Sequence, residues 1–270
     1  FCISVRDGVP ETILRNGIIV MKKTALAVAV LALSPVAAQA DLLFTVGTKA
    51  SVWNAEATGD LDEGVSVEDD GLNLDSENGT QISVFFEHPV PFLPNIKVRN
   101  TALELEGDGS LTATFADQTF NENVVSTMDL SHTDLTLYWG VPLPVPFVDI
   151  NFGLNARQFD GVAEVTGETS DVTESVDLDF VLPMLYGEVK VNTPIGIYGN
   201  IDINYVGYGD NKMTDLSYGL GYDLPIPVVD LGLEAGYRGL NLQTDPDDVD
   251  IDADVDVSCM YFGASLAVGF

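Results

Sequence analysis

The feature that most constrains this chain is an alternation of apolar and polar residues with a period of two, repeated in many segments. In residues 215–224, for example, Leu216 and Tyr218 alternate with Ser217 and Gly219. This alternation indicates a strand with one apolar face. The same pattern occupies residues 44–52, 148–157, 195–205 and 229–238. Each segment has about the 9 to 11 residues with which a tilted strand crosses a membrane.

Two kinds of connection separate these segments. Proline-rich stretches at 89–94, 142–147 and 225–227, with a simpler turn at 192–194, are short and interrupt strand pairing, since proline has no N–H to donate. They alternate with longer polar segments, at 54–78, 107–126, 160–175, 209–213 and 242–256. Short turns alternating with long loops are typical of outer-membrane barrels. We therefore expect an all-β fold, a closed antiparallel up-and-down transmembrane β-barrel of about ten strands.

Two segments interrupt the alternation. In residues 96–105 the apolar positions change phase after Arg99, and in residues 176–192 they change phase around Pro183. A β-bulge re-aims side chains in this way, and proline is tolerated at bulges. We expect one bulge in each segment. If these two segments are misread, the barrel has eight or twelve strands.

Alternating strands also occur in soluble sandwiches, so the position of the aromatic residues matters. Six of them lie beside the short turns or the chain ends, and Trp53 lies at the other end of its strand from Phe44. Aromatic side chains collect in two girdles at the membrane interfaces of barrels. The residues beside the short turns and termini are Phe44, Phe92, Trp139, Phe147, Tyr222 and Phe270. Their placement favours a membrane barrel.

The N-terminal region has the pattern of an exported protein. Lys22 and Lys23 precede an apolar stretch, and Ala38-Gln39-Ala40 matches the small-x-small site of signal peptidase. We expect residues 1–20 to be a translated upstream extension, residues 21–40 a signal peptide, and residues 41–270 the barrel domain. The apolar stretch is about half as long as a membrane-spanning helix. The expected location is the cell outer membrane.

The composition is strongly acidic, with 11 Lys and Arg against 42 Asp and Glu and a formal net charge of −31. Neutralising phosphates requires basic side chains, so this balance argues against nucleic acid as a partner. It suits cations instead.

The densest acidic tract occupies residues 245–256. With a period of two, five aspartates would project from one face of an extended arm, and their carboxylates could hold Ca²⁺ or bridge a divalent cation to lipopolysaccharide phosphates. These candidate metal ligands are Asp248, Asp250, Asp252, Asp254 and Asp256. The alternative is a solvated, self-repelling loop, because charge runs usually face water. The tract lacks the glycine and closing glutamate of an EF-hand.

His132 is the one candidate for catalysis, since it shares a strand face with Asp134 and follows Ser131. Adjacent residues of a regular strand point to opposite faces, so Ser131 cannot pass a proton directly to His132. We expect no catalytic site and no cofactor.

Five basic residues share the polar face that would line the lumen, together with several acids. The basic residues are Lys49, Arg99, Arg157, Lys190 and Arg238; the acids are Asp149, Glu188, Asp202, Asp230 and Glu234. They could line a narrow cation-preferring pore or pair with one another and plug it. A barrel of about eight to ten strands has an interior that side chains largely fill, which favours the plug.

The last segment carries a family resemblance. Met260, Phe262, Leu266 and Phe270 lie on one face together with Ala264 and Val268, and the segment ends on an aromatic residue. It resembles the C-terminal signature that the barrel assembly machinery reads. With the signal peptide and the acidic segment after Trp53, the chain resembles a family of small Gram-negative outer-membrane β-barrel proteins of unassigned function, over nearly all of the expected barrel domain. The resemblance implies no functional residues.

These observations together predict a non-enzymatic outer-membrane protein, either structural or a narrow cation-leaning channel. The alternatives are a surface adhesion or divalent-cation-binding protein that acts through its acidic outer loops, and an outer-membrane hydrolase. The expected partners are outer-membrane lipid and lipopolysaccharide, and the barrel assembly machinery through Phe270. We expect a monomer.

Overall fold

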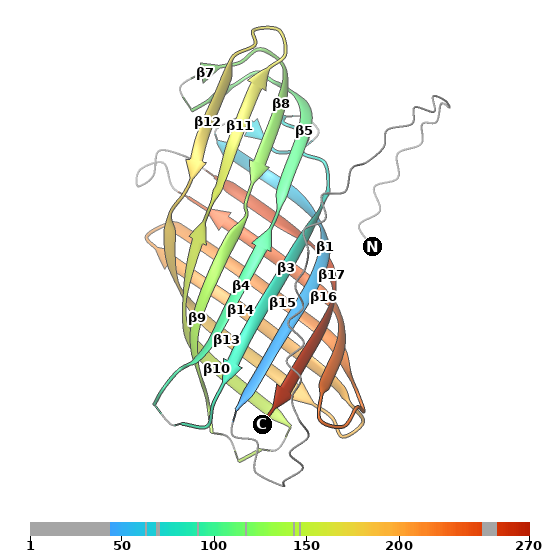
Figure 1. Ribbon diagram of the computed structural model, residues 1–270. Helices are drawn as coiled ribbons and strands as arrows, with labels where there is room; N and C mark the ends of the chain where they lie inside the picture. The colour runs from blue at the N-terminus through green and yellow to red at the C-terminus, as the bar shows by residue number, and fades with distance from the viewer. Residues whose placement is uncertain are drawn as a thin grey trace, which may run out of the picture. The chain divides into compact units, whose positions relative to one another are not determined.

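The computed structural model describes residues 44–244 and 253–270, apart from 63, 69, 70, 91, 117, 143 and 146 (Figure 1). The expected upstream extension and signal peptide, residues 1–40, lie outside these residues and stay predictions. Every regular element in the described part is a strand. No helix long and apolar enough to cross a membrane occurs among the described residues.

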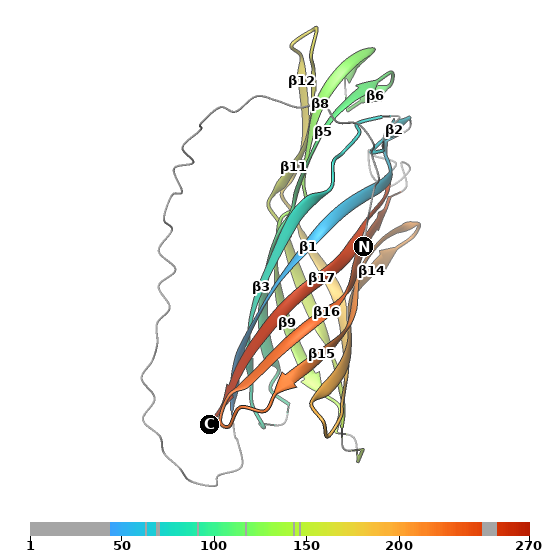
Figure 2. The ribbon, with the colours of Figure 1, turned by 90° about the vertical axis from the view of Figure 1, so that its right-hand side faces the viewer.

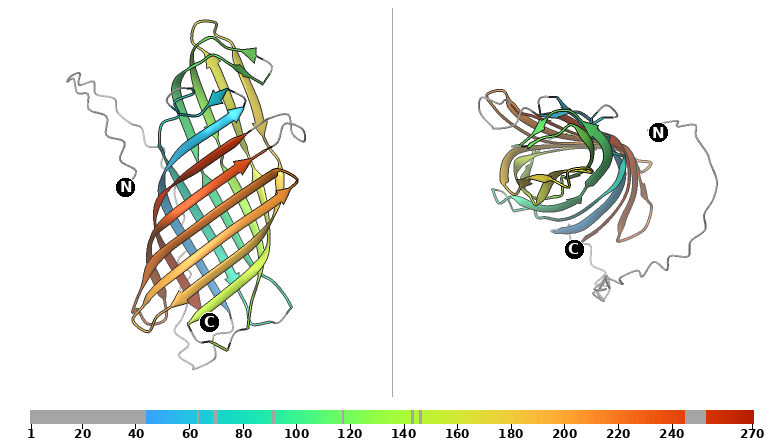
Figure 3. Two further views of the ribbon diagram at one scale, coloured as in Figure 1. Left: turned by 180° about the vertical axis from the view of Figure 1, so that it is seen from behind. Right: turned by 90° about the horizontal axis from the view of Figure 1, so that it is seen from above.

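Ten strands form a closed antiparallel barrel, which confirms the predicted fold class. The strands tilt across the barrel and form a ring when seen from above (Figure 3). The first and last strands close the ring, with one register from Thr45 and Gly269 to Asp60 and Asp254. The barrel strands, in ring order, are β1 (Thr45–Asp62), β3 (Glu77–Glu87), β4 (Asn95–Ala102), β9 (His132–Gly140), β10 (Val148–Phe159), β13 (Val181–Asn192), β14 (Ile197–Tyr208), β15 (Asn211–Leu224), β16 (Asp230–Gln243) and β17 (Asp254–Gly269).

The proline-containing connections lie where the sequence predicts them. The segments at 89–94, 142–147, 192–194 and 225–227 join β3 to β4, β9 to β10, β13 to β14 and β15 to β16. Since consecutive hairpins alternate between the two ends of an up-and-down barrel, all four connections belong to one end, the short-turn end. Both chain ends of the barrel meet there, because Phe44 and Phe270 exchange backbone hydrogen bonds.

The opposite end differs from the prediction. Segments 107–126 and 160–175, expected to be loops, instead contain a four-stranded sheet that rises beyond the barrel on one side (Figure 2). Its strands, in order across the sheet, are β12 (Thr173–Leu178), β11 (Gly161–Gly167), β8 (Glu122–Asp129) and β5 (Glu104–Leu111). We call this sheet the outer extension. The expected loop at 209–213 is also shorter, since β15 already begins at Asn211.

The outer extension continues four barrel strands without a change of register. Thr101 pairs with His132, and three residues further along the same two chains Glu104 pairs with Asp129. Leu130 donates its backbone N–H to Leu103 across the junction. The strands β4, β9, β10 and β13 therefore run on as β5, β8, β11 and β12.

The predicted bulges at 96–105 and 176–192 are wrong. Register is continuous through both, and even residues of the second segment face inward from Val176 to Glu188. Along the first segment the polarity of the outward-facing residues changes. Val98 is apolar and exposed on the barrel, whereas on the extension the outward residue Glu104 is charged and the inward residue Leu103 is apolar. The apparent change of phase is a change of polarity on an unbroken strand.

The extension has a core of its own. The first long connection folds onto its inner face, where Leu72 and Val67 are buried against Leu105 and Leu111. A side chain at Gly107 would overlap the backbone carbonyl of Leu72, so this close approach requires glycine. The connection contains β2 (Val65–Ser66), and the β5–β8 connection contains β6 (Thr114–Phe115) and β7 (Gln118–Thr119).

The outer surface of the barrel is apolar. Outward-facing residues such as Leu154, Leu220 and Phe262 are exposed by 58%, 70% and 60%. In a soluble protein so large a continuous apolar surface would be exceptional. It has the composition of the lipid-facing band of an outer-membrane barrel.

Candidate functional site

The interior of the barrel holds the largest concentration of ionisable side chains in the described part. Four of them form a layer toward the outer-extension end of the barrel, which we call the upper ion-pair layer. It consists of Asp134, Arg157, Asp215 and Arg238 from β9, β10, β15 and β16. All four side chains are at most 4% exposed. Period-two alternation brings each of them to the inner face.

The upper ion-pair layer is joined by paired, geometrically matched hydrogen bonds. Arg157 donates through Nε and Nη2 to the two oxygens of Asp134, at 2.8 and 3.0 Å. Arg238 donates in the same way to the two oxygens of Asp215, at 3.0 and 2.9 Å. Arg157 also donates to Asp215 and so links the two pairs across the lumen. Bidentate guanidinium–carboxylate pairs of this kind are the strong, directional ones.

The layer reaches the opposite wall. Arg238 lies 3.5 Å from the hydroxyl of Thr101 and 3.4 Å from Nε2 of His132. β16 and β9 face each other across the ring of ten strands. The ion pairs therefore span the lumen and do not merely line it.

A second cluster lies beside this layer, around the buried Asp202. Its carboxylate accepts from Lys97 at 3.0 Å and from Arg99 at 2.9 Å. Tyr186 donates to the same oxygen at 3.1 Å and also receives a hydrogen bond from Lys97. Arg99 and Asp202 were predicted from the sequence to lie in the lumen, whereas Lys97 was not among the predicted residues. Its position two residues before Arg99 was the available signal.

The third cluster surrounds Glu234. Lys49 donates to Glu234 at 2.6 Å, Tyr198 donates at 3.1 Å, and Tyr261 donates as well. Lys190 lies 4.2 Å above the ring of Tyr198. All five basic residues that the sequence assigns to the lumen thus have an acidic or aromatic neighbour there.

Pairing is what allows so many charges to be buried. Removing an ion from water costs several kcal/mol even after relaxation, and only a well-placed partner offsets this cost. The buried carboxylates of Asp134, Asp202 and Asp215 each have at least one Arg or Lys nitrogen within 3.0 Å. These bonds place paired side chains across the lumen.

His132 is fixed in the neutral form by its two neighbours. Its Nδ1 lies 2.7 Å from the carbonyl oxygen of Leu130, so Nδ1 must carry the proton. Its Nε2 faces Arg238, which can only donate. The hydroxyl of Ser131 instead accepts from the backbone of Leu103. Ser131 and His132 therefore have separate hydrogen-bond partners and do not bond to each other.

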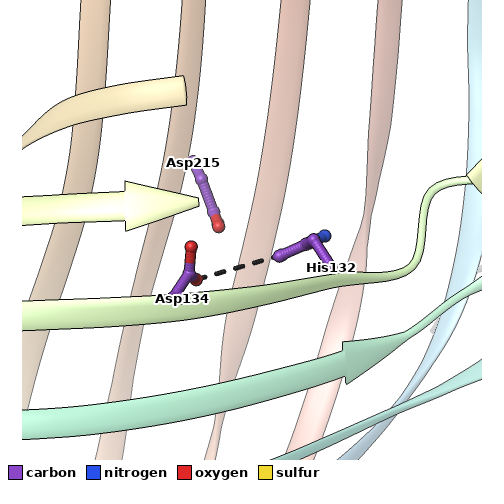
Figure 4. Close-up of side chains that lie close together, drawn as sticks. All are labelled: His132, Asp134 and Asp215. Atoms are coloured by element: carbon purple, nitrogen blue, oxygen red, sulfur yellow. Dashed lines mark ion pairs between the residues drawn. The ribbon is translucent and has the colours of Figure 1, made fainter. Parts of the chain in front are cut away.

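His132 also belongs to a group with metal-ligand character, together with Asp134 and Asp215 (Figure 4). One donor atom from each lies within 4.8 Å of the others, and His132 Nε2 is 4.0 Å from Asp134. Both carboxylates, however, are already engaged by Arg157 and Arg238. A cation here would have to displace buried guanidinium groups, so we assign no metal to this group.

The acidic tract is described only in part. Asp248, Asp250 and Asp252 lie outside the described residues, so the divalent-cation site remains a prediction. Asp254 and Asp256 belong to β17 and lie on the face opposite to the buried Val255 and Val257. Asp254 accepts a hydrogen bond from Gln243 at 3.0 Å.

Comparison with known proteins finds similarity in structure only. No protein-family model matches the chain. No curated protein matches it either. Solved structures that match include the CymD monoaromatic hydrocarbon channel, at 10% identity and a TM-score of 0.32, covering 86% of this chain and 70% of that one. The toluene transporter TbuX of Ralstonia pickettii matches at 11% identity and a TM-score of 0.33, covering 84% and 64%.

A deletion mutant of the TodX monoaromatic hydrocarbon channel matches at 10% identity and a TM-score of 0.31, covering 86% of this chain and 91% of that one. Similarity at this level carries no information about what the present chain binds or transports. The barrel topology described above stands on its own strand pairing.

Proposed function

We propose that this chain is a non-enzymatic β-barrel protein of the outer membrane whose lumen is closed to ions. The observation that carries the proposal is the upper ion-pair layer, which bridges strands on opposite sides of the ring. A pore that conducts by diffusion needs a continuous water-filled path. Here the middle of the path is filled by side chains that bond to one another.

The exterior supports the membrane assignment and the partners. Its apolar band suits outer-membrane lipid and lipopolysaccharide. The C-terminal Phe270 is 62% exposed at the short-turn end and pairs with Phe44, which leaves its ring accessible to the barrel assembly machinery. Pairing of β1 with β17 completes the ring of ten strands, so neither the first nor the last strand offers a free edge, which suits a monomer.

A narrow cation-leaning channel is the second candidate. Toward the short-turn end Asp149, Glu188, Asp223 and Asp230 surround the single basic residue Lys190 among the described residues of these strand ends. If the ion pairs opened, this end would favour cations, because acids outnumber bases there.

Conductance in planar lipid bilayers tests the proposal. We expect the wild-type barrel to show no steady ohmic steps. The triple variant Arg157→Ala, Asp215→Ala, Arg238→Ala removes the bridging groups and is expected to conduct, with a reversal potential in a KCl gradient that indicates cation selectivity.

The matched control removes three charges outside the lumen, with Glu104→Ala, Glu106→Ala and Glu164→Ala, all exposed on the outer extension. It should stay silent. Faster migration of unheated than heated protein on a gel confirms that each variant is folded. Ohmic steps from the wild-type protein would overturn the closed lumen and favour the channel.

A further inference from the structure

The inner face of the barrel changes character just above the upper ion-pair layer. Along five strand lines the inward positions pass from charged or polar to apolar within one or two steps of the alternation. The change occurs from Arg157 to Phe159, from Asp215 to Met213, from Arg238 to Leu240, from Asn204 to Val206 and from His132 to Leu130. Because five strands change at the same level, the interior is divided into a charged lower part and an apolar upper part.

The apolar part encloses a cavity of about 350 Å³. One wall is the inner face of the outer extension, with Met128, Ala163 and Leu178, and the facing wall comes from the barrel strands, with Val206 and Leu240. The surface that faces the cavity is apolar throughout.

The floor of the cavity is Phe159. Its ring centroid lies 5.3 Å from that of His132 and 5.8 Å from the guanidinium carbon of Arg157. Phe159 therefore separates the cavity from the upper ion-pair layer, and a molecule in the cavity meets carbon and not charge.

A void of this size is unusual for a packed core. Protein interiors contain few voids larger than a water molecule, whereas small-molecule pockets measure roughly 300 to 1,000 Å³. Water is held poorly where no polar group can bond to it, and apolar cavities accept apolar guests instead. The cavity therefore has the size and the apolar lining of a small-molecule pocket.

β13 and β14 both line the cavity, and their pairing ends shortly before β14 itself ends at Tyr208. β13 and β14 pair from Asn192 and Tyr198 up to Leu185 and Tyr205, and the ladder stops there. Beyond this point Leu182 and Tyr208 both line the cavity without being paired to each other.

Pro183 lies two residues beyond the last pair and has no N–H to continue the ladder. This proline, expected from sequence to mark a bulge, instead accompanies the separation of two strands. The two strands that separate here both contribute lining residues to the cavity.

Acidic residues on the outer extension disfavour anionic ligands. The solvent-facing side of the outer extension carries exposed acids, including Glu104, Glu106 and Glu164. Their field repels anions within about a Debye length, roughly 10 Å at ordinary ionic strength. The cavity lining also includes Asn211, Lys212, Gln243 and Thr244, but their polar atoms contribute no surface to the cavity. An anionic group inside would therefore face carbon atoms alone, and a buried charge without a bonding partner is costly.

We infer that the cavity binds one small, uncharged apolar molecule, which enters between β13 and β14. The proposal does not depend on whether the lumen conducts.

The test is equilibrium binding to the purified barrel in lipid nanodiscs, using two related fluorophores. N-phenyl-1-naphthylamine is uncharged, and 8-anilino-1-naphthalenesulfonate adds an anionic group. After subtraction of empty nanodiscs, we expect saturable binding of the uncharged probe with one site per chain. Binding of the sulfonate should be at least about tenfold weaker, because its charge would be buried without a partner.

Two variants fill the cavity from opposite walls, Ala163→Phe on β11 and Val206→Phe on β14. Each should weaken binding of N-phenyl-1-naphthylamine by about tenfold or more. The control Leu220→Phe adds to the lipid-facing surface, where Leu220 is 70% exposed, and should bind as wild type does.

A signal proportional to lipid alone would overturn the proposal, and so would binding that persists unchanged in a folded cavity-filling variant. Two fillings are used because one of them could prevent folding, which mobility of the unheated protein on a gel reveals. Equal affinity for both probes would overturn the assignment of an uncharged ligand.

Discussion

The outer extension continues four of the ten barrel strands, yet its faces have the opposite chemistry to those of the barrel. On the continuous line β10–β11, Leu154 and Glu164 point to the same outer side, one from the barrel and the other from the extension. On the inner side Arg157 gives way to Ala163 and Val165.

This difference shows that the medium around each region, and not the backbone, determines which face of a strand is apolar. Outside the barrel the medium expected is lipid, so apolar side chains are favoured there and the paired charges lie within. Outside the extension the medium is water, so acids lie on the surface and the apolar side chains form a core. One strand can satisfy both because the period of two is the same in each region.

The largest expected effect comes from Asp215→Ala, which tests whether the buried ion pairs stabilise the barrel. This change leaves Arg157 and Arg238 buried with a shared acceptor removed, and breaking a buried pair in this way costs about 3 to 5 kcal/mol. The free energy of unfolding in urea, measured in detergent or lipid, should fall by that amount. A loss as small as that of an exposed acid such as Glu106→Ala would mean that the ion pairs do not hold the barrel together.

The comparison of the two outer faces is tested by one substitution at two positions. Leu154→Arg puts a charge on the barrel exterior, where an arginine costs about 2 to 4 kcal/mol near the membrane midplane. Glu164→Arg on the same strand line faces water and should change stability by less than about 0.5 kcal/mol, as surface substitutions usually do. Urea unfolding of both variants in liposomes measures the difference. Equal effects would contradict lipid as the medium around the barrel.

The smallest effect concerns the tip of the outer extension. Glu122 accepts the backbone N–H groups of Thr169 and Ser170, at 2.7 and 3.0 Å. Hydrogen bonds from Ser170, followed by those from Thr169, lower the pKa of Glu122 below its ordinary value of 4.5.

A lowered pKa means that the charged form stabilises the folded tip. This contribution is fully present above about pH 4.5, the unfolded value, and is lost as the pH falls through the lower folded value. Amide hydrogen exchange of Thr169 and Ser170 should therefore accelerate on acidification relative to the intrinsic rate. In Glu122→Gln that extra acceleration should disappear.

The lumen residues show how far sequence alone can go. The period of two assigns Arg99, Arg157 and Arg238 to the inner face, and the structure confirms all three. It cannot say which acid each one meets. Arg157 and Asp215 are 58 residues apart and Arg99 and Asp202 are 103 apart, so their contacts depend on how strands are staggered around the ring.

Sequence alone predicts the alternation, the ten strands, the turns at one end and the faces of most side chains, because these follow from local geometry that repeats every two residues. The remaining features depend on contacts between segments that are far apart in the chain. Whether a polar stretch such as 160–175 is a loop or a strand depends on a neighbour to pair with, and β8 and β12 provide one. The cavity likewise exists only because strands distant in the chain change from polar to apolar at one level.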